Sequence, residues 1–143
     1  QGADLRHINT VVDIYNYISI KHLVPVGGDD LDHVEGDIAL TVAKGDESFK
    51  ELNSDEVKSP NEGEIIYVDD KEVLCRRWNW RECDKSKMTK GTKNITLVVE
   101  GLPPVTYDQI KMILGELADL IKSHLGGTVK TSIVNKARRE IEF

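Results

Sequence analysis

The clearest structural signal in this sequence is one long helical pattern near its C-terminal end. Apolar residues recur every three or four positions from Ile110 to Leu125, the spacing of one face of an α-helix. Thr106 and the glutamine three residues later resemble a capping box, and Gly126-Gly127 is a common way to end a helix. We therefore predict a helix with a wide apolar face that stops at the two glycines.

A second helical pattern lies near the N-terminus. Apolar residues at three- and four-residue spacing predict a helix from about Arg6 to His22. Pro25 should end it, and Gly27-Gly28 is expected to form a turn. The residues of this apolar stripe are Ile8, Val11, Val12, Tyr15 and Ile18.

Strand patterns fill most of the middle of the chain. Alternation over residues 38–42 predicts a half-buried strand, residues 64–76 read as a β-hairpin that turns at Asp70-Lys71, and residues 94–100 predict a further strand. The acidic segment 45–63 is expected to be an exposed excursion, with room for a short hairpin. Val129, Thr131 and Ile133 alternate again, so the last third reads as strand, helix and strand, an order that normally forms a right-handed crossover.

Length and composition exclude several classes of protein. The 143 residues, 39% of them apolar and 31% charged, suit one globular domain. There is no apolar stretch of membrane-spanning length and no secretory leader, so we expect a cytoplasmic protein. Cys75 and Cys83 are expected to be buried or half-buried thiols rather than a disulfide or zinc ligands, and the four histidines are scattered. We expect no metal and no cofactor.

The charge is unevenly distributed along the chain. The net charge of −6 argues against general affinity for nucleic acids, because phosphate binding depends on Lys and Arg. However, residues 71–93 hold eight basic and only three acidic side chains. This segment is either a local anion site or a solvated charged face, and charge alone leaves both readings open.

The densest functional signal is the run from Cys75 to Asp84, which interleaves Arg76, Arg77 and Arg81 with Trp78 and Trp80. Guanidinium groups form forks that bind phosphates, and indoles offer flat faces for stacking. The alternative is structural. The two indoles would then pack on one face of a strand while the arginines are solvated or paired with Glu82 and Asp84.

Other polar residues are weaker candidates. Glu64, Asp69, Asp84 and Glu100 fall at the ends of expected strands, where carboxylates can converge on a cleft and bind an ammonium group or water. Asn16 on the first helix and Asp30 after the double glycine are not diagnostic by themselves. The hydroxyl residues near position 89 have no neighbouring histidine in sequence, so covalent catalysis is poorly supported.

Four segments closely resemble stand-alone proteins with the B3/B4 fold, which is also the editing domain of the phenylalanyl-tRNA synthetase β chain. They are residues 8–16, 23–31, 63–67 and 75–84, and the likeness extends from about Ile8 to Gly127. The Arg-Trp-Asn-Trp-Arg run from Arg77 to Arg81 is specific for the stand-alone proteins. The resemblance implies an α+β, B3/B4-like layered fold with a mixed β-sheet and packed helices, as a single domain over residues 1–143. Because residue 1 is Gln and not Met, we also expect an N-terminal helical segment of the family to be missing.

The resemblance places individual residues. Asn16 matches the site asparagine of the family, Asp30 matches its aspartate, and Gly36-Asp37-Ile38 begins the same strand. Gly27 stands where the synthetase carries a histidine in its editing pocket. A glycine has no side chain to hydrogen-bond the ribose or the amino acid, so recognition of tyrosine in the manner of the synthetase is not expected.

The function that the resemblance implies is the hydrolysis of mischarged aminoacyl-tRNA, at the ester between a wrong amino acid and the 3′-terminal ribose. The implied partners are the acceptor end of tRNA and a non-cognate amino acid such as tyrosine or an arginine mimic. Implied catalytic residues are Asn16, Asp30, Asn79 and Asp84, and implied substrate-binding residues are Glu64, Arg76, Arg77, Trp78, Arg81 and Glu100. The alternatives are a non-catalytic module of the same fold that binds an amino acid, a nucleotide or a partner protein, and a structural subunit of a larger assembly.

Overall fold

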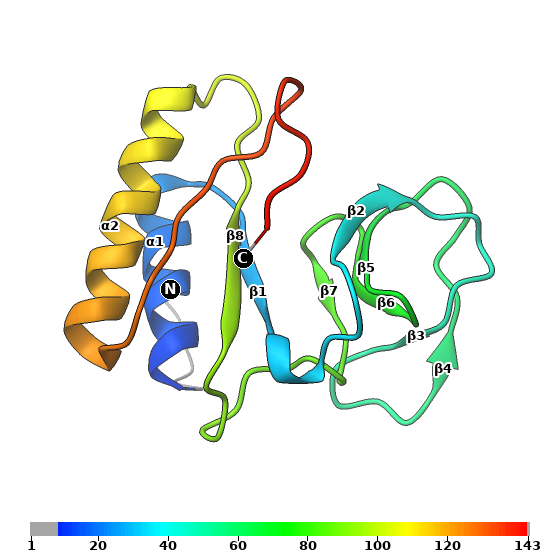
Figure 1. Cartoon of the computed structure of the whole chain (residues 1–143). Coiled ribbons are helices and arrows are strands. Elements are labelled where there is room, and N and C mark those ends of the chain that lie inside the picture. The colour runs from blue at the N-terminus through cyan, green and yellow to red at the C-terminus, as the bar shows by residue number, and fades with distance from the viewer. Residues whose placement is uncertain (1–8, 143) are drawn as a thin grey trace, which may run out of the picture. The chain divides into compact units, whose positions relative to one another are not determined.

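A computed structural model of the chain describes residues 9–142, which form an α+β protein with two compact units. One unit comprises the described residues up to Val26 and from Val99 onward, and it carries both helices. The other is Gly27–Val98 and holds most of the strands (Figure 1). The elements are α1 (Thr10–His22), β1 (Val26–Asp30), η1 (Leu31–His33), β2 (Ala39–Val42), β3 (Phe49–Lys50), β4 (Val57–Lys58), β5 (Ile65–Val68), β6 (Val73–Arg76), β7 (Arg81–Glu82), β8 (Ile95–Val99) and α2 (Tyr107–Leu125).

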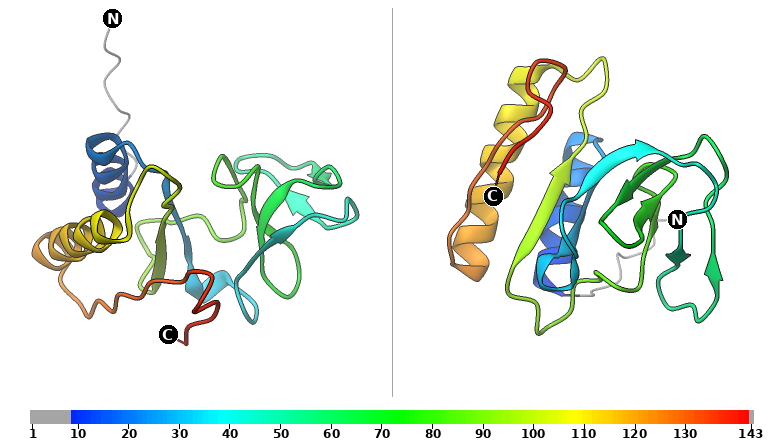
Figure 2. Two further views of the ribbon diagram at one scale, coloured as in Figure 1. Left: turned by 90° about the horizontal axis from the view of Figure 1, so that it is seen from above. Right: turned by 45° about the vertical axis from the view of Figure 1, so that its right-hand side comes forward.

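The two helices are defined by local signals at their ends, and they pack against each other (Figure 2). In α2 both hydrogen bonds of the predicted capping box are present, and the helix ends at Gly126 as expected. The first helix was predicted too long at its N-terminus. Asn9 is extended and its side chain accepts from the Val12 N–H at 3.0 Å, so α1 begins at Thr10, while Arg6 lies outside the described residues. The left-handed Leu23 ends it.

The double glycine forms part of a strand, so the predicted turn was wrong. Gly27 and Gly28 lie in β1, which pairs with β8 in a two-stranded sheet. A Cβ on Gly28 would lie 2.1 Å from the carbonyl oxygen of Thr96 in β8. The close approach of the two backbones therefore requires glycine at this position.

The predicted final strand is also absent from the described residues. Residues 128–142 have no strand and run back beside α2 (Figure 2). The short alternation of Val129, Thr131 and Ile133 finds no partner strand for a ladder, and the right-handed crossover expected after the helix therefore does not form. A local turn, in which Asn135 N donates to Arg138 O at 2.8 Å, orders part of the segment instead.

The main sheet has the strand order β2-β5-β6-β7 and is antiparallel throughout. The mixed sheet expected from the family resemblance is therefore not found here. The hairpin predicted over residues 64–76 is confirmed as β5 and β6, and the acidic excursion contains the short antiparallel hairpin β3–β4. In β6 and β7, Cys75 pairs with Glu82 and Arg76 pairs with Arg81.

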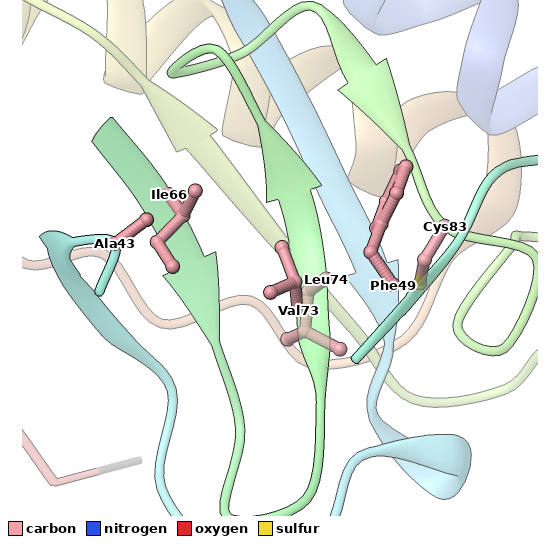
Figure 3. Close-up of a cluster of buried hydrophobic side chains, with 6 residues drawn as sticks. All are labelled: Ala43, Phe49, Ile66, Val73, Leu74 and Cys83. Carbon is pink, nitrogen blue, oxygen red and sulfur yellow. The ribbon is translucent and has the colours of Figure 1, made fainter. Parts of the chain in front are cut away.

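The core of this unit lies where β6 contacts its neighbours. Its buried side chains are Ala43, Phe49, Ile66, Val73, Leu74 and Cys83 (Figure 3). Phe49 comes from the acidic excursion yet is only 1% exposed, so the excursion is anchored by this ring. In β2, by contrast, Leu40 and Val42 are exposed, and the expectation of a half-buried strand was wrong for them. Both cysteines are buried free thiols, as predicted.

Candidate functional site

The β6–β7 hairpin carries most of the predicted site residues, and its turn spans residues 77–80. Arg77 and Trp78 both have left-handed backbone, with φ of 51° and 67°. The Trp78 N–H donates to Ile65 O at 2.7 Å, which ties the turn to β5. The two tryptophans therefore belong to a turn. The structural alternative, which placed both on one face of a strand, was wrong on this point. In the strands themselves, alternation places the Arg76–Arg81 pair on the face opposite to the Cys75–Glu82 pair.

One face of the hairpin forms a basic hollow of about 250 Å³, which we call the arginine hollow. It is lined by Phe49, Glu51, Lys58, Arg76, Arg77 and Arg81. Arg76 is largely buried and binds Glu64 with two hydrogen bonds of 3.0 and 2.8 Å, and this pairing lowers the pKa of the Glu64 carboxyl. Arg76 therefore has a structural role in pairing with Glu64.

The other two arginines of the hollow are more exposed. Arg81 Nη1 lies 2.9 Å from a carboxylate oxygen of Glu51, whereas Arg77 Nε lies 4.0 Å from Glu64. Arg77 is thus the most weakly paired of the three. Both guanidinium groups flank the exposed ring of Trp80, with their Cζ atoms 5.2 Å (Arg77) and 4.5 Å (Arg81) from its centroid. The hollow therefore offers cations beside a flat aromatic ring.

Around the turn, two polar side chains meet at Gly27 of β1. A Cβ on Gly27 would lie 2.4 Å from Asn79 Oδ1 and 3.1 Å from Glu82 Oε1. The amide and the carboxylate therefore occupy the space that a side chain at position 27 would need. The absence of a side chain at Gly27 thus makes room for Asn79.

The acids Asp29 and Glu82 lie next to this position. Asp29 is 8% exposed and accepts a hydrogen bond of 2.5 Å from Ser86 Oγ, and burial raises the pKa of its carboxyl. Burial also raises the pKa of Glu82 to about 7, and the charge of Asp29 adds to the effect. Burial likewise raises the pKa of the Cys75 thiol. Of these three groups, Glu82 is the one whose pKa lies near neutral pH.

Sequence reasoning missed Asp29 and Glu82 as site residues. Glu82 was considered only as an ion-pair partner for the arginines. Strand alternation could have found it, because Glu82 directly follows Arg81 in the second strand of the hairpin and therefore points to the face opposite to the arginines. No sequence signal showed that β1 would approach it.

Two predicted catalytic residues have carboxylates that are already engaged. Asp30 is fully buried and binds Thr92 Oγ1 at 2.6 Å and the Asp32 N–H at 3.1 Å. Although burial opposes ionisation, these hydrogen bonds hold the pKa of Asp30 below its usual value. Asp84 Oδ1 accepts from Lys87 Nζ at 2.7 Å, which lowers the pKa of Asp84.

The remaining predicted residues lie elsewhere. Asn16 is half-buried on α1, and Glu100 follows β8 with its N–H bound to Pro25 O at 3.0 Å, so both belong to the helical unit. Trp78 is half-buried in the hairpin turn. The structure thus groups Glu64 with Arg76 and Arg77, places Asn79 at Gly27, and leaves Asp84 in its own contact with Lys87.

Asp69, the fourth of the strand-end carboxylates, supports the fold. It is 7% exposed and accepts hydrogen bonds from Lys85 Nζ and from three backbone N–H groups at 2.8–2.9 Å. These contacts outweigh its burial and lower its pKa to about 2.

Neither a metal centre nor a membrane-spanning helix is found in the part of the chain that the structure describes. Residues 9–142 contain no cluster of three or more His, Cys, Asp and Glu side chains arranged to hold a metal ion. Within the same residues, neither helix has the length and apolar character needed to cross a bilayer.

Comparison with known proteins places the chain in a family. The family model for the B3/4 domain matches residues 1–123, so this chain belongs to the B3/4 domain family. It is 33% identical over 119 residues to the phenylalanine–tRNA ligase β subunit of Fusobacterium nucleatum subsp. nucleatum. That alignment covers 83% of this chain and 15% of the ligase subunit, so the chain spans only a small part of that relative's length.

A solved structure confirms the fold. An N-terminal fragment of the phenylalanyl-tRNA synthetase β-subunit from Pyrococcus horikoshii matches with a TM-score of 0.63 at 15% identity. The match covers 78% of this chain and 38% of the fragment. The α+β, B3/4-like fold expected from the sequence is therefore confirmed.

Proposed function

We propose that this protein hydrolyses mischarged aminoacyl-tRNA, releasing a non-cognate amino acid from the 3′-terminal ribose. The observation that carries the proposal is the arginine hollow. In a chain of net charge −6, three arginines and Lys58 gather in one hollow beside Trp80. Membership of the B3/4 family and the likeness to synthetase β subunits support a role at tRNA. Such a reaction belongs to the cytoplasm.

The hollow suits the single-stranded end of a tRNA. Guanidinium forks bind phosphate oxygens in pairs, and an exposed indole can stack on any base without reading sequence. Arg77 is free to turn to a phosphate because its contact with Glu64 is 4.0 Å long. Arg81 would exchange the exposed carboxylate of Glu51 for the ligand. The small extent of the hollow favours contact with the acceptor end alone.

The chemistry requires little acid or base strength, because the ester of an aminoacyl-tRNA is intrinsically reactive. A pocket that positions water and excludes the cognate amino acid can suffice. In the proposal, Asn79 contacts the substrate. Asp30 and Asp84 act by holding their loops, because their carboxylates are already bonded. Glu64 orients Arg76, and Trp78 fixes the turn.

The test is single-turnover deacylation of a panel of mischarged tRNAs that includes tyrosyl, canavanyl and seryl esters. We expect one ester to be lost well above its spontaneous rate. Arg77→Ala should weaken tRNA binding and make it less salt-dependent, because one phosphate contact is lost. Asn79→Ala should abolish the acceleration. Lys44→Ala is the matched control, because it removes one exposed cation of the same unit that does not line the hollow.

Two outcomes would contradict the proposal. If folded protein accelerates the loss of no ester, the non-catalytic module becomes the better description, and binding of free amino acids, nucleotides or a larger assembly should then be measured. If Arg77→Ala and Lys44→Ala weaken tRNA binding equally, the hollow is not the tRNA site.

A further inference from the structure

Glu82 does not line the arginine hollow, and the function proposed above gives it no task. Glu82 pairs with Cys75 across the hairpin, on the side opposite to Arg76 and Arg81. Its Oε1 and Asn79 Oδ1 both lie close to where a Cβ on Gly27 would be, at 3.1 and 2.4 Å. Three chain segments, β1, the turn and β7, thus contribute to one small polar site.

The Glu82 carboxyl is partly shielded from solvent but can still be reached by a small molecule. Its side chain is neither fully buried nor exposed, so a small molecule such as water can reach it. The groups that act on its carboxyl are Asp29 from β1 and Cys75 from β6, and no cation of residues 9–142 is among them. A structural carboxylate of this burial would normally be paired with a cation, as Glu64 is with Arg76. Glu82 is therefore held in a state suited to accept and release a proton.

We propose that Glu82 is the general base of this domain and that Asn79 is the hydrogen-bonding partner that positions the attacking water beside Gly27. This inference rests on the proposed deacylase function and adds a catalytic residue to it. A side chain at position 27 would displace the Asn79 amide, whose Oδ1 lies 2.4 Å from the Cβ position.

The reaction balances without any further reactant. The Glu82 carboxylate takes one proton from water as the water oxygen bonds to the ester carbonyl carbon. The carbonyl–ribose C–O bond then breaks, and the ribose oxygen receives that proton from the Glu82 carboxyl. The products are a free amino acid and a tRNA with an intact 3′-terminal ribose, and the carboxylate is regenerated.

The acidity of Glu82 fits this role. With a pKa of about 7, it is about half ionised at neutral pH, where a general base is most effective. Burial is the main cause, and the neighbouring Asp29 carboxyl disfavours a second negative charge. The ionised fraction of Glu82 rises as pH rises through 7, so the catalysed rate should rise with it.

The first experiment compares Glu82→Gln with wild type in single-turnover deacylation of the ester identified above. We expect the rate to fall at least about 100-fold, as for loss of a general base, while the Kd for tRNA stays within about twofold. Glu62→Gln is the matched control, because it removes one exposed carboxylate of the same unit, and its rate should be unchanged. Thermal unfolding of each variant verifies that it is folded.

The second experiment measures the pH dependence of the same rate, with spontaneous hydrolysis measured in the same buffers and subtracted. Wild type should show a rate that rises with pH and levels off above about 7, and a carboxyl NMR titration should find the same midpoint for Glu82. In Glu82→Ala, added formate should restore part of the rate, which a purely structural role would not allow. This variant also serves if Glu82→Gln does not fold.

The outcomes separate the two proposals. An active wild type whose Glu82→Gln variant keeps more than half the rate overturns the role of Glu82 and leaves the deacylase function standing. A Glu82 midpoint near that of an ordinary glutamate, or no rescue by formate, also contradicts the general base. Inactivity of wild type toward every ester removes both proposals.

Discussion

The buried carboxylate of Asp69 should make the free energy of unfolding fall at acid pH, and Asp69→Asn should remove that part of the pH dependence. Its pKa is lowered from 3.8 to about 2 because contacts with Lys85 and three backbone N–H groups outweigh the effect of burial. A carboxyl with a lowered pKa in the folded state stabilises the fold above its unfolded pKa, and that contribution is lost as pH falls through the folded value. The difference corresponds to about 2.4 kcal/mol at neutral pH, of which about 2 kcal/mol is lost by pH 2.

The assay is urea unfolding at a series of pH values from 7 to 2, with Asp69→Asn and wild type compared at each. The comparison isolates Asp69 from other acids that titrate over this range. We expect the difference in unfolding free energy to shrink by about 2 kcal/mol between pH 5 and pH 2. Asp46→Asn, at an exposed aspartate of the same unit, should differ little from wild type at any pH. A difference between Asp69→Asn and wild type that does not change with pH would refute the reasoning.

Three further substitutions test the packing and the pairing described above. Gly28→Ala should destabilise the protein by about 1–3 kcal/mol in urea unfolding, because its Cβ would lie 2.1 Å from Thr96 O and force β1 from β8; an unchanged midpoint would contradict that contact. Thr106→Ala should cost about 1 kcal/mol by removing the cap of α2, whereas Thr106→Ser should restore most of it. Arg76→Ala should lower the free energy of unfolding by about 3–5 kcal/mol, because Glu64 would be left largely buried and unpaired. Arg77→Ala should change it little. Equal effects of the two substitutions on thermal stability would show that Glu64 does not depend on Arg76 in particular.

Sequence patterns predicted the elements whose signals are local. The capping box at Thr106, the periodic apolar face of α2 and the hairpin over residues 64–76 need only neighbouring residues to be recognised, and all three are present. The β1 strand was missed because the contact that explains it joins residues that are far apart in the sequence. Two adjacent glycines normally indicate a turn, and only contact with Thr96, far along the chain, shows that Gly28 serves close backbone packing.

The candidate site was predictable only in part, because charge can be read from sequence and burial cannot. The basic run around the tryptophans identified the residues of the arginine hollow. Glu82 was overlooked because its raised pKa depends on burial and on Asp29, which is 53 residues away in sequence. Asp30, by contrast, was named from the family pattern, and its bonds to Thr92 and Asp32 show how firmly it is held.

The contact between Gly27 and Asn79 links the evolution of two positions that are distant in sequence. The Asn79 oxygen lies 2.4 Å from the Cβ position of residue 27, so a side chain at that position requires the Asn79 amide to move away from the β1 backbone. Related proteins with a larger residue at position 27 should therefore carry a smaller or differently directed one at position 79. A change at position 27 alone would force the Asn79 side chain to move, so we expect the two positions to change together.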